Sequence, residues 1–129
     1  MKALLDKELC DKYPEIFKDR YGDMKKTAMC WGIETDDGWY KLINKLCSDI
    51  MKACGKTIPI ATQVKEKYGG LRFYIDGGDD DIFTLISKAE EKSEYICEIC
   101  GEKGKIREKK GWFKTLCQSD AEKLEYIPL

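Results

Sequence analysis

The sequence predicts an α+β fold in which helices pack on a small antiparallel β-hairpin, with a cysteine-containing module appended at the C-terminal end. Apolar residues recur at three- and four-residue steps over 39–54, which is typical of an amphipathic helix. Residues 58–75 carry β-branched and aromatic side chains around a Gly-Gly turn, which predicts a hairpin. Two short β-like stretches lie between a cysteine pair and a third cysteine in 97–117. We therefore expect an α+β core domain over residues 1–94 and a second module over 95–129, packed on it.

Length and composition limit the class of protein. A chain of 129 residues fits one domain with a small appended module, and 43% hydrophobic residues suffice for a core. The net charge of −1 gives no overall attraction to nucleic acid or to an anionic membrane, so such binding would need a local patch. No apolar run approaches the roughly 18 residues needed to cross a bilayer, and the first residues turn polar too early for a signal peptide. The odd count of 7 cysteines also favours a reducing compartment. We expect a cytoplasmic protein with no membrane partner.

The N-terminal part is predicted to be largely helical. Residues 3–20 form a helix-prone opening, which Pro14 divides at Tyr13 because the residue before a proline avoids helical backbone. Residues 21–35 are mixed, and their apolar side chains fit either a short buried strand or a turn.

One amphipathic helix is predicted before the hairpin in the sequence, and another after it. Residues 36–38 supply a cap for a helix over 39–53, and Gly55 is a suitable stop just past its end. The acidic run at residues 79–81 is expected to cap the next helix, over 82–95, because carboxylates are favoured at the positive end of a helix.

The central hairpin is predicted to turn at Gly69-Gly70, so that Tyr68 opposes Leu71 and Val64 opposes Ile75. One face is then mostly apolar, with Glu66 as the exception. The other face gathers positive and aromatic side chains, namely Lys65, Lys67, Arg72 and Tyr74. Two interpretations fit that face: a solvated surface whose charges discourage edge pairing, or a cationic patch that binds phosphate or an acidic protein.

The C-terminal module is predicted to contain two strands, over 105–107 and 112–116, around a turn at 109–111. A short helix over 121–126 follows. The hairpin tip is expected to be basic, through Lys103, Lys105, Arg107, Lys109 and Lys110.

Cysteine spacing in this module predicts a metal site. Cys97 and Cys100 form a knuckle followed by glycine, and Cys117 comes after sixteen intervening residues, a spacing found in two-knuckle zinc sites. Asp120 stands where a fourth Cys or His would be expected, and a carboxylate oxygen is an acceptable zinc ligand. A competing interpretation makes Asp120 the cap of the helix that begins at Ala121. A site with three thiolates leaves the zinc ion little Lewis acidity, which favours a structural ion in a zinc-ribbon-like module.

The remaining cysteines have a simpler interpretation. Cys10, Cys47 and Cys54 fall among apolar residues in helical patterns, where free cysteine behaves as a small apolar side chain. Cys30 lies beside Trp31 without a motif around it.

The chain contains no histidine, and this limits its chemistry. Ser-His-Asp and Cys-His nucleophilic catalysis and histidine-based metallohydrolase sites are excluded. A hydrolase built on Glu66 with Asp76 or the acidic run at 79–81 remains a minor alternative, because the Glu-x-Lys order of many nucleases is missing. The sequence thus inclines against an enzyme.

Four segments together resemble a family of small proteins of uncharacterised function encoded by bacteriophages and prophages. They are Asp37–Tyr40, Gln63–Tyr74, Cys97–Gly101 and Gly111–Cys117, and the likeness covers most of residues 37–120. Members of such families usually complete the second knuckle with Cys or His, so Asp120 is a departure. The resemblance implies a phage context, the cytoplasm of a bacterial host and a zinc module.

These observations favour a function in binding. The leading hypothesis is a zinc-binding accessory protein that engages a host or phage protein, with inhibition of a host defence system as a specific case. The second hypothesis is a nucleic-acid-binding module that uses both basic hairpins. The expected contact residues are Lys65, Lys67, Arg72, Tyr74, Lys109 and Lys110.

Overall fold

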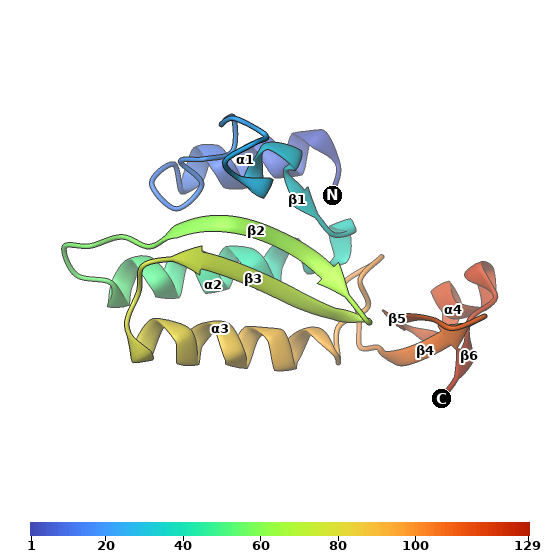
Figure 1. Ribbon diagram of the computed structural model, residues 1–129. Helices are drawn as coiled ribbons and strands as arrows, with labels where there is room; N and C mark the ends of the chain where they lie inside the picture. The colour runs from blue at the N-terminus through green and yellow to red at the C-terminus, as the bar shows by residue number, and fades with distance from the viewer.

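The computed structural model describes all residues from 1 to 129 and has the α+β architecture that the sequence predicts. Four α-helices, two short 3-10 helices and two three-stranded sheets make up the chain (Figure 1). The first sheet has the order β1-β2-β3 and the second has the order β5-β4-β6.

Helix α1 (Ala3–Lys12) ends just before Tyr13, where the following proline disfavours helical backbone. The predicted continuation to residue 20 is wrong, because the chain there forms turns. The segment predicted as a strand or turn contains both a 3-10 helix, η1 (Ala28–Trp31), and a short strand, β1 (Ile33–Glu34). The buried carboxylate of Asp6 on α1 accepts from Ile33 N of β1 at 2.7 Å and from Arg20 Nε at 2.9 Å. Arg20 in turn donates to Cys30 O of η1 at 3.0 Å, so η1 and β1 are both held against α1.

Strands β2 (Ile60–Lys67) and β3 (Gly70–Asp76) form the predicted antiparallel hairpin, and β1 pairs in parallel with β2. The predicted register is wrong by two residues, since Val64 faces Phe73 rather than Ile75. The turn residues are Tyr68 and Gly69, with φ values of 53° and 86°. A two-residue turn of this kind needs positive φ at both positions, and Gly69 N donates to Glu66 Oε2 at 2.7 Å, which fixes the turn locally.

A register shift of two residues leaves every side chain on its predicted face. Val64, Leu71 and Phe73 are therefore buried, as expected. Opposite them, the pairs Lys65–Arg72 and Gln63–Tyr74 share the other face of the sheet. We call the side chains of Lys65, Lys67, Arg72 and Tyr74 the open face.

Two helices cover the buried face of the sheet: α2 (Tyr40–Ala53) and α3 (Asp80–Ser93) (Figure 1). Their apolar sides join a core cluster of 19 buried residues, in which Trp39 is the largest fully buried side chain. The predicted cap of α3 is confirmed, because Asp79 accepts from Ile82 N at 3.0 Å. The predicted cap of α2 is wrong: a 3-10 turn, η2 (Asp37–Trp39), precedes the helix and no capping side chain is present.

Helix α3 also covers the outer edge of β3. Leu71 N donates to Ser93 Oγ at 2.9 Å, and Phe73 N donates to Glu90 Oε2 at 3.0 Å. Side chains of a neighbouring helix thus satisfy backbone donors that an edge strand would otherwise present for pairing. This edge is closed to an added strand.

Residues 95–129, here called the C-terminal module, lie at one end of the core, beyond the tip of the β2–β3 hairpin (Figure 1). Strands β4 (Lys105–Lys109) and β5 (Trp112–Leu116) form the expected hairpin around Lys110 and Gly111. Helix α4 (Gln118–Leu124) starts three residues earlier than predicted, and β6 (Ile127–Pro128), which pairs with β4, was not expected from sequence. The module's own core contains only Cys97, Leu116 and Ala121.

Close backbone contacts join the module to the core. Gly38 N donates to Glu98 O at 2.6 Å, and Thr115 Oγ1 donates to Gly69 O at 2.6 Å. A Cβ atom at Gly38 would lie 2.1 Å from the carbonyl oxygen of Cys97, so only glycine allows this approach. The boundary at residues 94 and 95 stays a prediction. None of the helices is long and apolar enough to cross a membrane.

Candidate metal centre

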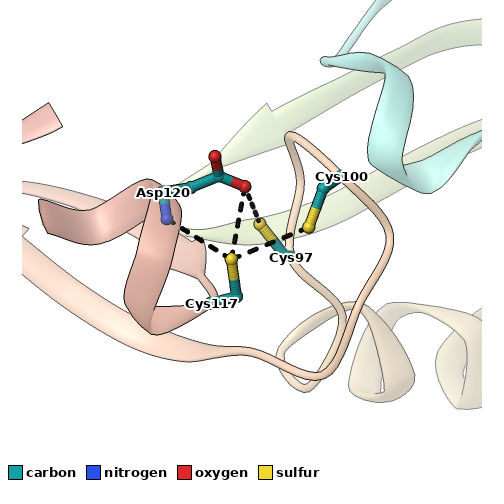
Figure 2. Close-up of side chains that lie close together, drawn as sticks. All are labelled: Cys97, Cys100, Cys117 and Asp120. Atoms are coloured by element: carbon teal, nitrogen blue, oxygen red, sulfur yellow. Dashed lines mark hydrogen bonds between the residues drawn. The ribbon is translucent and has the colours of Figure 1, made fainter. Parts of the chain in front are cut away.

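The knuckle begins directly after α3 and is shaped by backbone hydrogen bonds. Gly101 N donates to Cys97 O at 2.9 Å, and Cys97 N donates to Glu102 O at 2.7 Å. Gly101 has a φ of 83°, a left-handed conformation that glycine adopts without strain. This tight turn brings the side chains of Cys97 and Cys100 to the same side of the loop (Figure 2).

The second half of the cluster comes from the end of β5 and the first turn of α4. Cys117 is the N-cap residue of α4, and its sulfur accepts from Asp120 N at 3.4 Å. Asp120 lies within the first turn of the helix and directs its carboxylate at the sulfurs (Figure 2). The interpretation of Asp120 as the helix cap is therefore wrong, because Cys117 already occupies that position.

The four predicted side chains converge on one point. The donor atoms of Cys97, Cys100, Cys117 and Asp120 all lie within 4.8 Å of one another. The sulfur atoms of Cys100 and Cys117 are 3.7 Å apart. Asp120 Oδ2 lies 3.3 Å from the sulfur of Cys97 and 3.3 Å from that of Cys117. In a tetrahedral zinc site the edges would measure roughly 3.8 Å between sulfurs and roughly 3.5 Å between sulfur and oxygen. The cluster could hold a metal ion with little rearrangement.

Burial and the close approach of the four donor groups shift the pKa values of Cys100 and Asp120. Burial, followed by hydrogen bonds with Asp120 and the neighbouring thiols, raises the pKa of the Cys100 thiol to about 12. Burial acts to raise the pKa of Asp120 as well, but hydrogen bonds from the three thiols outweigh it and leave this pKa lowered. The carboxylate is thus kept charged beside three sulfur atoms, and a bound cation would stabilise the whole set.

A buried acid lies beside the cluster and links it to the core. Glu98, between the two knuckle cysteines, is 2% exposed, and its Oε2 accepts from Asp36 N at 2.9 Å. Lys114 Nζ lies 3.2 Å from Glu98 Oε1 and 2.9 Å from Asp36 Oδ2. Lys114 and Glu98 Oε1 form an ion pair, but this buried oxygen has no hydrogen-bond partner. The three side chains hold the knuckle against the loop before α2.

The other cysteines lie away from this centre. Cys10 and Cys47 are buried in the main core, and burial raises the pKa of the Cys10 thiol to about 12. Cys54 is half-buried against the same core, and Cys30 is half-buried in η1. Only one group of side chains in the structure is arranged to hold a metal ion.

The expected contact residues lie on two separate surfaces, the open face and the tip of the β4–β5 hairpin. Lys65, Lys67 and Arg72 lie together on the open face, and none of the ion pairs in the structure involves them. Tyr74 lies on the same face and is 42% exposed. Glu34 of β1 is beside Lys65 in the sheet, so the face is not uniformly positive.

The tip of the β4–β5 hairpin is less basic than expected. Arg107 is buried and donates to Leu116 O at 3.0 Å, so its prediction as a tip residue is wrong. Lys109 turns toward α4, where Nζ donates to Leu124 O at 2.9 Å. Lys110 remains exposed at the turn. No sequence pattern marks Arg107 as buried, because alternation along the strand places it on the same face as Lys105 and Lys109.

The residues of the hydrolase alternative are not brought together. Glu66 lies near the hairpin tip, where it accepts from Gly69 N. Asp76 pairs with Ile60 at the far end of the same hairpin, about six residues or roughly 20 Å along the strand. Sequence reasoning also missed Tyr68 and Trp112 as surface residues that line a common pocket with Lys67 and Lys110. No sequence pattern signals this, because the two hairpins meet only in the tertiary structure.

Comparison of the chain with protein-family models, with curated proteins and with solved structures finds no match.

Proposed function

We propose that Cys97, Cys100, Cys117 and Asp120 bind one structural zinc ion in a zinc-ribbon-like module. The chemistry of the donors supports zinc, since three thiolates and one carboxylate match its preference for sulfur and its tetrahedral geometry. The number of donors supports a structural role. Four protein ligands fill a tetrahedron and leave no coordination position for a substrate.

We further propose that the protein acts by binding a macromolecular partner, not by catalysis. The observation that carries this proposal is the open face, where three cations lie together and take part in no ion pair. Opposed like charges on neighbouring strands destabilise a sheet slightly, and Lys65 stands directly opposite Arg72. An acidic surface on a partner would relieve that repulsion.

The partner in this proposal is a host or phage protein in the cytoplasm of an infected bacterium, and inhibition of a host defence system is the specific case. The resemblance to phage and prophage proteins suggests the setting, and the cationic face supplies the contact chemistry. A second candidate function, binding of nucleic acid, is favoured by a different observation, the pocket between the two hairpin tips.

Elemental analysis of protein purified without added metal tests the zinc proposal. We expect about one zinc per chain, and its loss in Cys97→Ser. Cys47→Ser is the matched control, because Cys47 is buried in the main core and should leave the zinc content unchanged. A protein that contains no zinc and keeps an ordered module in Cys97→Ser would contradict the proposal.

Asp120 tests the fourth ligand. Asp120→Ala should weaken zinc binding in a chelator competition, whereas Asp120→Cys and Asp120→His should restore or strengthen it, because they supply a sulfur or nitrogen donor. Glu122→Ala, on the exposed side of the same helix, is the control. If Asp120→Ala holds zinc as tightly as the parent protein, the carboxylate is not a ligand.

Affinity capture from bacterial lysate tests the open face. A partner retained by the parent should be lost when Lys65, Lys67 and Arg72 are all replaced by Ser. Replacement of the exposed residues Lys52, Lys56 and Lys88 by Ser removes the same charge from other elements and should leave capture unchanged. Equal capture by both triple variants would show that the open face is a solvated surface with no role in binding.

A further inference from the structure

The tips of the two hairpins lie close together and enclose a pocket of about 430 Å³. The residues that line it come only from the two turns and their flanking strands, namely Glu66, Lys67, Tyr68, Lys110, Gly111, Trp112 and Phe113. We call this the tip pocket. It lies apart from the metal cluster, because none of the four donor residues lines it.

The two walls of the tip pocket are fixed to each other. Thr115 Oγ1 is buried and donates to Gly69 O at 2.6 Å. A Cβ atom at Gly69 would lie 3.5 Å from the Lys114 backbone nitrogen and 3.6 Å from the Ile106 side chain, so the first turn packs directly on the second hairpin. A site built on two packed hairpins is pre-organised, which lowers the entropic cost of binding.

The lining combines exposed aromatic rings with cations. Tyr68 is 70% exposed and Trp112 is 75% exposed, although large aromatic side chains usually bury most of their surface. Lys67 Nζ lies 5.5 Å from the centre of the Tyr68 ring, and Lys110 is exposed at the other turn. Glu66 is the only acidic residue in the lining, and one of its oxygens already accepts from Gly69 N at 2.7 Å.

We propose that the tip pocket binds single-stranded nucleic acid. A base stacks on Tyr68 or Trp112, and the adjoining phosphates lie near Lys67 and Lys110. This combination of stacking rings and flanking cations is the general means by which proteins hold single strands without reading their sequence. The second carboxylate oxygen of Glu66 is an acceptor for an exocyclic amino group of the base.

Size and shape favour this occupant over others. The pocket volume lies at the lower end of the range for small-molecule sites, and seven lining residues are far fewer than the roughly 20 to 30 that each side of a stable protein interface contributes. A duplex keeps its bases stacked inside and cannot offer a base face to Tyr68 or Trp112. A flexible single strand can present a base and its phosphates to one concave site.

This inference rests on the second candidate function, nucleic-acid binding, and specifies a single strand as the ligand; it does not depend on the proposed protein partner. The two surfaces share Lys67, so variants of Trp112 and Lys110 separate them, because neither residue belongs to the open face. Zinc content is measured in every variant, so that loss of the metal module is distinguished from loss of the pocket.

The experiment is fluorescence anisotropy of labelled poly(dT) and poly(U) strands, titrated with the full-length protein over a range of salt concentrations. We expect binding that weakens as salt rises, because phosphate contacts release counterions. Trp112→Ala should weaken binding about tenfold through lost stacking. Lys110→Ser should weaken it and reduce the salt slope by about 0.7, the value for one phosphate contact on a single strand.

Controls are available elsewhere on the surface. Trp31→Ala removes a tryptophan that is 64% exposed on η1, and Lys88→Ser removes an exposed cation from α3. Neither should change the affinity. Trp112→Phe keeps a stacking ring and should retain most of the binding.

Several results would overturn the proposal. One is absence of binding to either strand at low salt, and another is unchanged affinity in both Trp112→Ala and Lys110→Ser. Equal affinity for a blunt duplex would show that charge alone is responsible. Binding of an acidic peptide such as poly(Asp) that depends on Trp112, without binding of either strand, would identify the pocket as a protein contact instead.

Discussion

The core and the C-terminal module differ in how many apolar side chains they bury. The core, residues 1–94, buries a cluster of 19 side chains between the first sheet and its helices. The C-terminal module, at 95–129, buries a cluster of 3, and one of these is the candidate metal ligand Cys97. Each large buried aliphatic side chain contributes about 1.5 to 3 kcal/mol, so the core can be stable through apolar burial alone. The module cannot.

Small domains have too little interior to offset the entropy of ordering their chain, and they commonly depend on a metal ion or on disulfides. The module has such a small interior. The donor cluster lies beside the small apolar cluster of the module and shares Cys97 with it. A metal ion bound there would join the knuckle to α4. Its contacts with the core, through Gly38 and Gly69, supply the remaining support.

Metal removal should produce the largest difference between the two parts. Binding of zinc contributes on the order of 10 kcal/mol to the folding of small metal modules, so a strong chelator should unfold 95–129 and leave the core folded. Hydrogen exchange measures this directly, as lost protection of amides in β4, β5 and α4 with retained protection in α2 and β2. Simultaneous loss of protection in both parts would show that they form one cooperative unit.

Trp39→Ala should produce the next largest effect, and it should act on both parts. Trp39 is fully buried in the core, and its Nε1 donates to Ile96 O at 2.9 Å, at the entrance to the module. Replacement of a buried tryptophan by alanine costs about 3 to 5 kcal/mol. Denaturant unfolding followed by circular dichroism checks the value. Trp31→Ala, at an exposed position, should leave the midpoint nearly unchanged.

Lys114→Met tests the polar link between the two parts. The substitution leaves the carboxylate of Glu98, which is 2% exposed, with its charge unpaired. Loss of one partner of a buried pair costs about 3 to 5 kcal/mol, and we expect about 3 kcal/mol because the Lys114 side chain is still 21% exposed. The double variant with Glu98→Gln should recover part of this loss, because the unpaired charge is gone. A strictly additive double-mutant cycle would contradict a direct interaction.

Replacement of Lys65, Lys67 and Arg72 by Ser should have the smallest effect on stability. These side chains take part in no ion pair, and exposed charges contribute little to folding. The melting temperature should stay close to that of the parent while partner capture is lost. A large fall in melting temperature would show that the open face is covered in the folded protein.

Local patterns were informative wherever a single element or turn sets the structure. The helical spacing over 39–54 predicted α2, and the acidic run predicted the cap of α3, because both depend on residues within a few positions of each other. The knuckle spacing likewise indicated the donor set, and the structure brings all four side chains together. The predicted hairpin register was wrong because both Gly69-Gly70 and Tyr68-Gly69 fit a two-residue turn, and the structure uses Tyr68-Gly69.

The sequence by itself determined the α+β class, the open face and the residues of the donor cluster, because alternation, helical periodicity and knuckle spacing act over short distances along the chain. Only the tertiary structure decided that Arg107 is buried, that Cys117 and not Asp120 caps α4, and that Tyr68 and Trp112 line one pocket. The shared pocket of Tyr68 and Trp112 arises where segments more than 40 residues apart come into contact, as at Gly69 and Thr115. The packing of the whole chain fixes such contacts, and no local pattern encodes them.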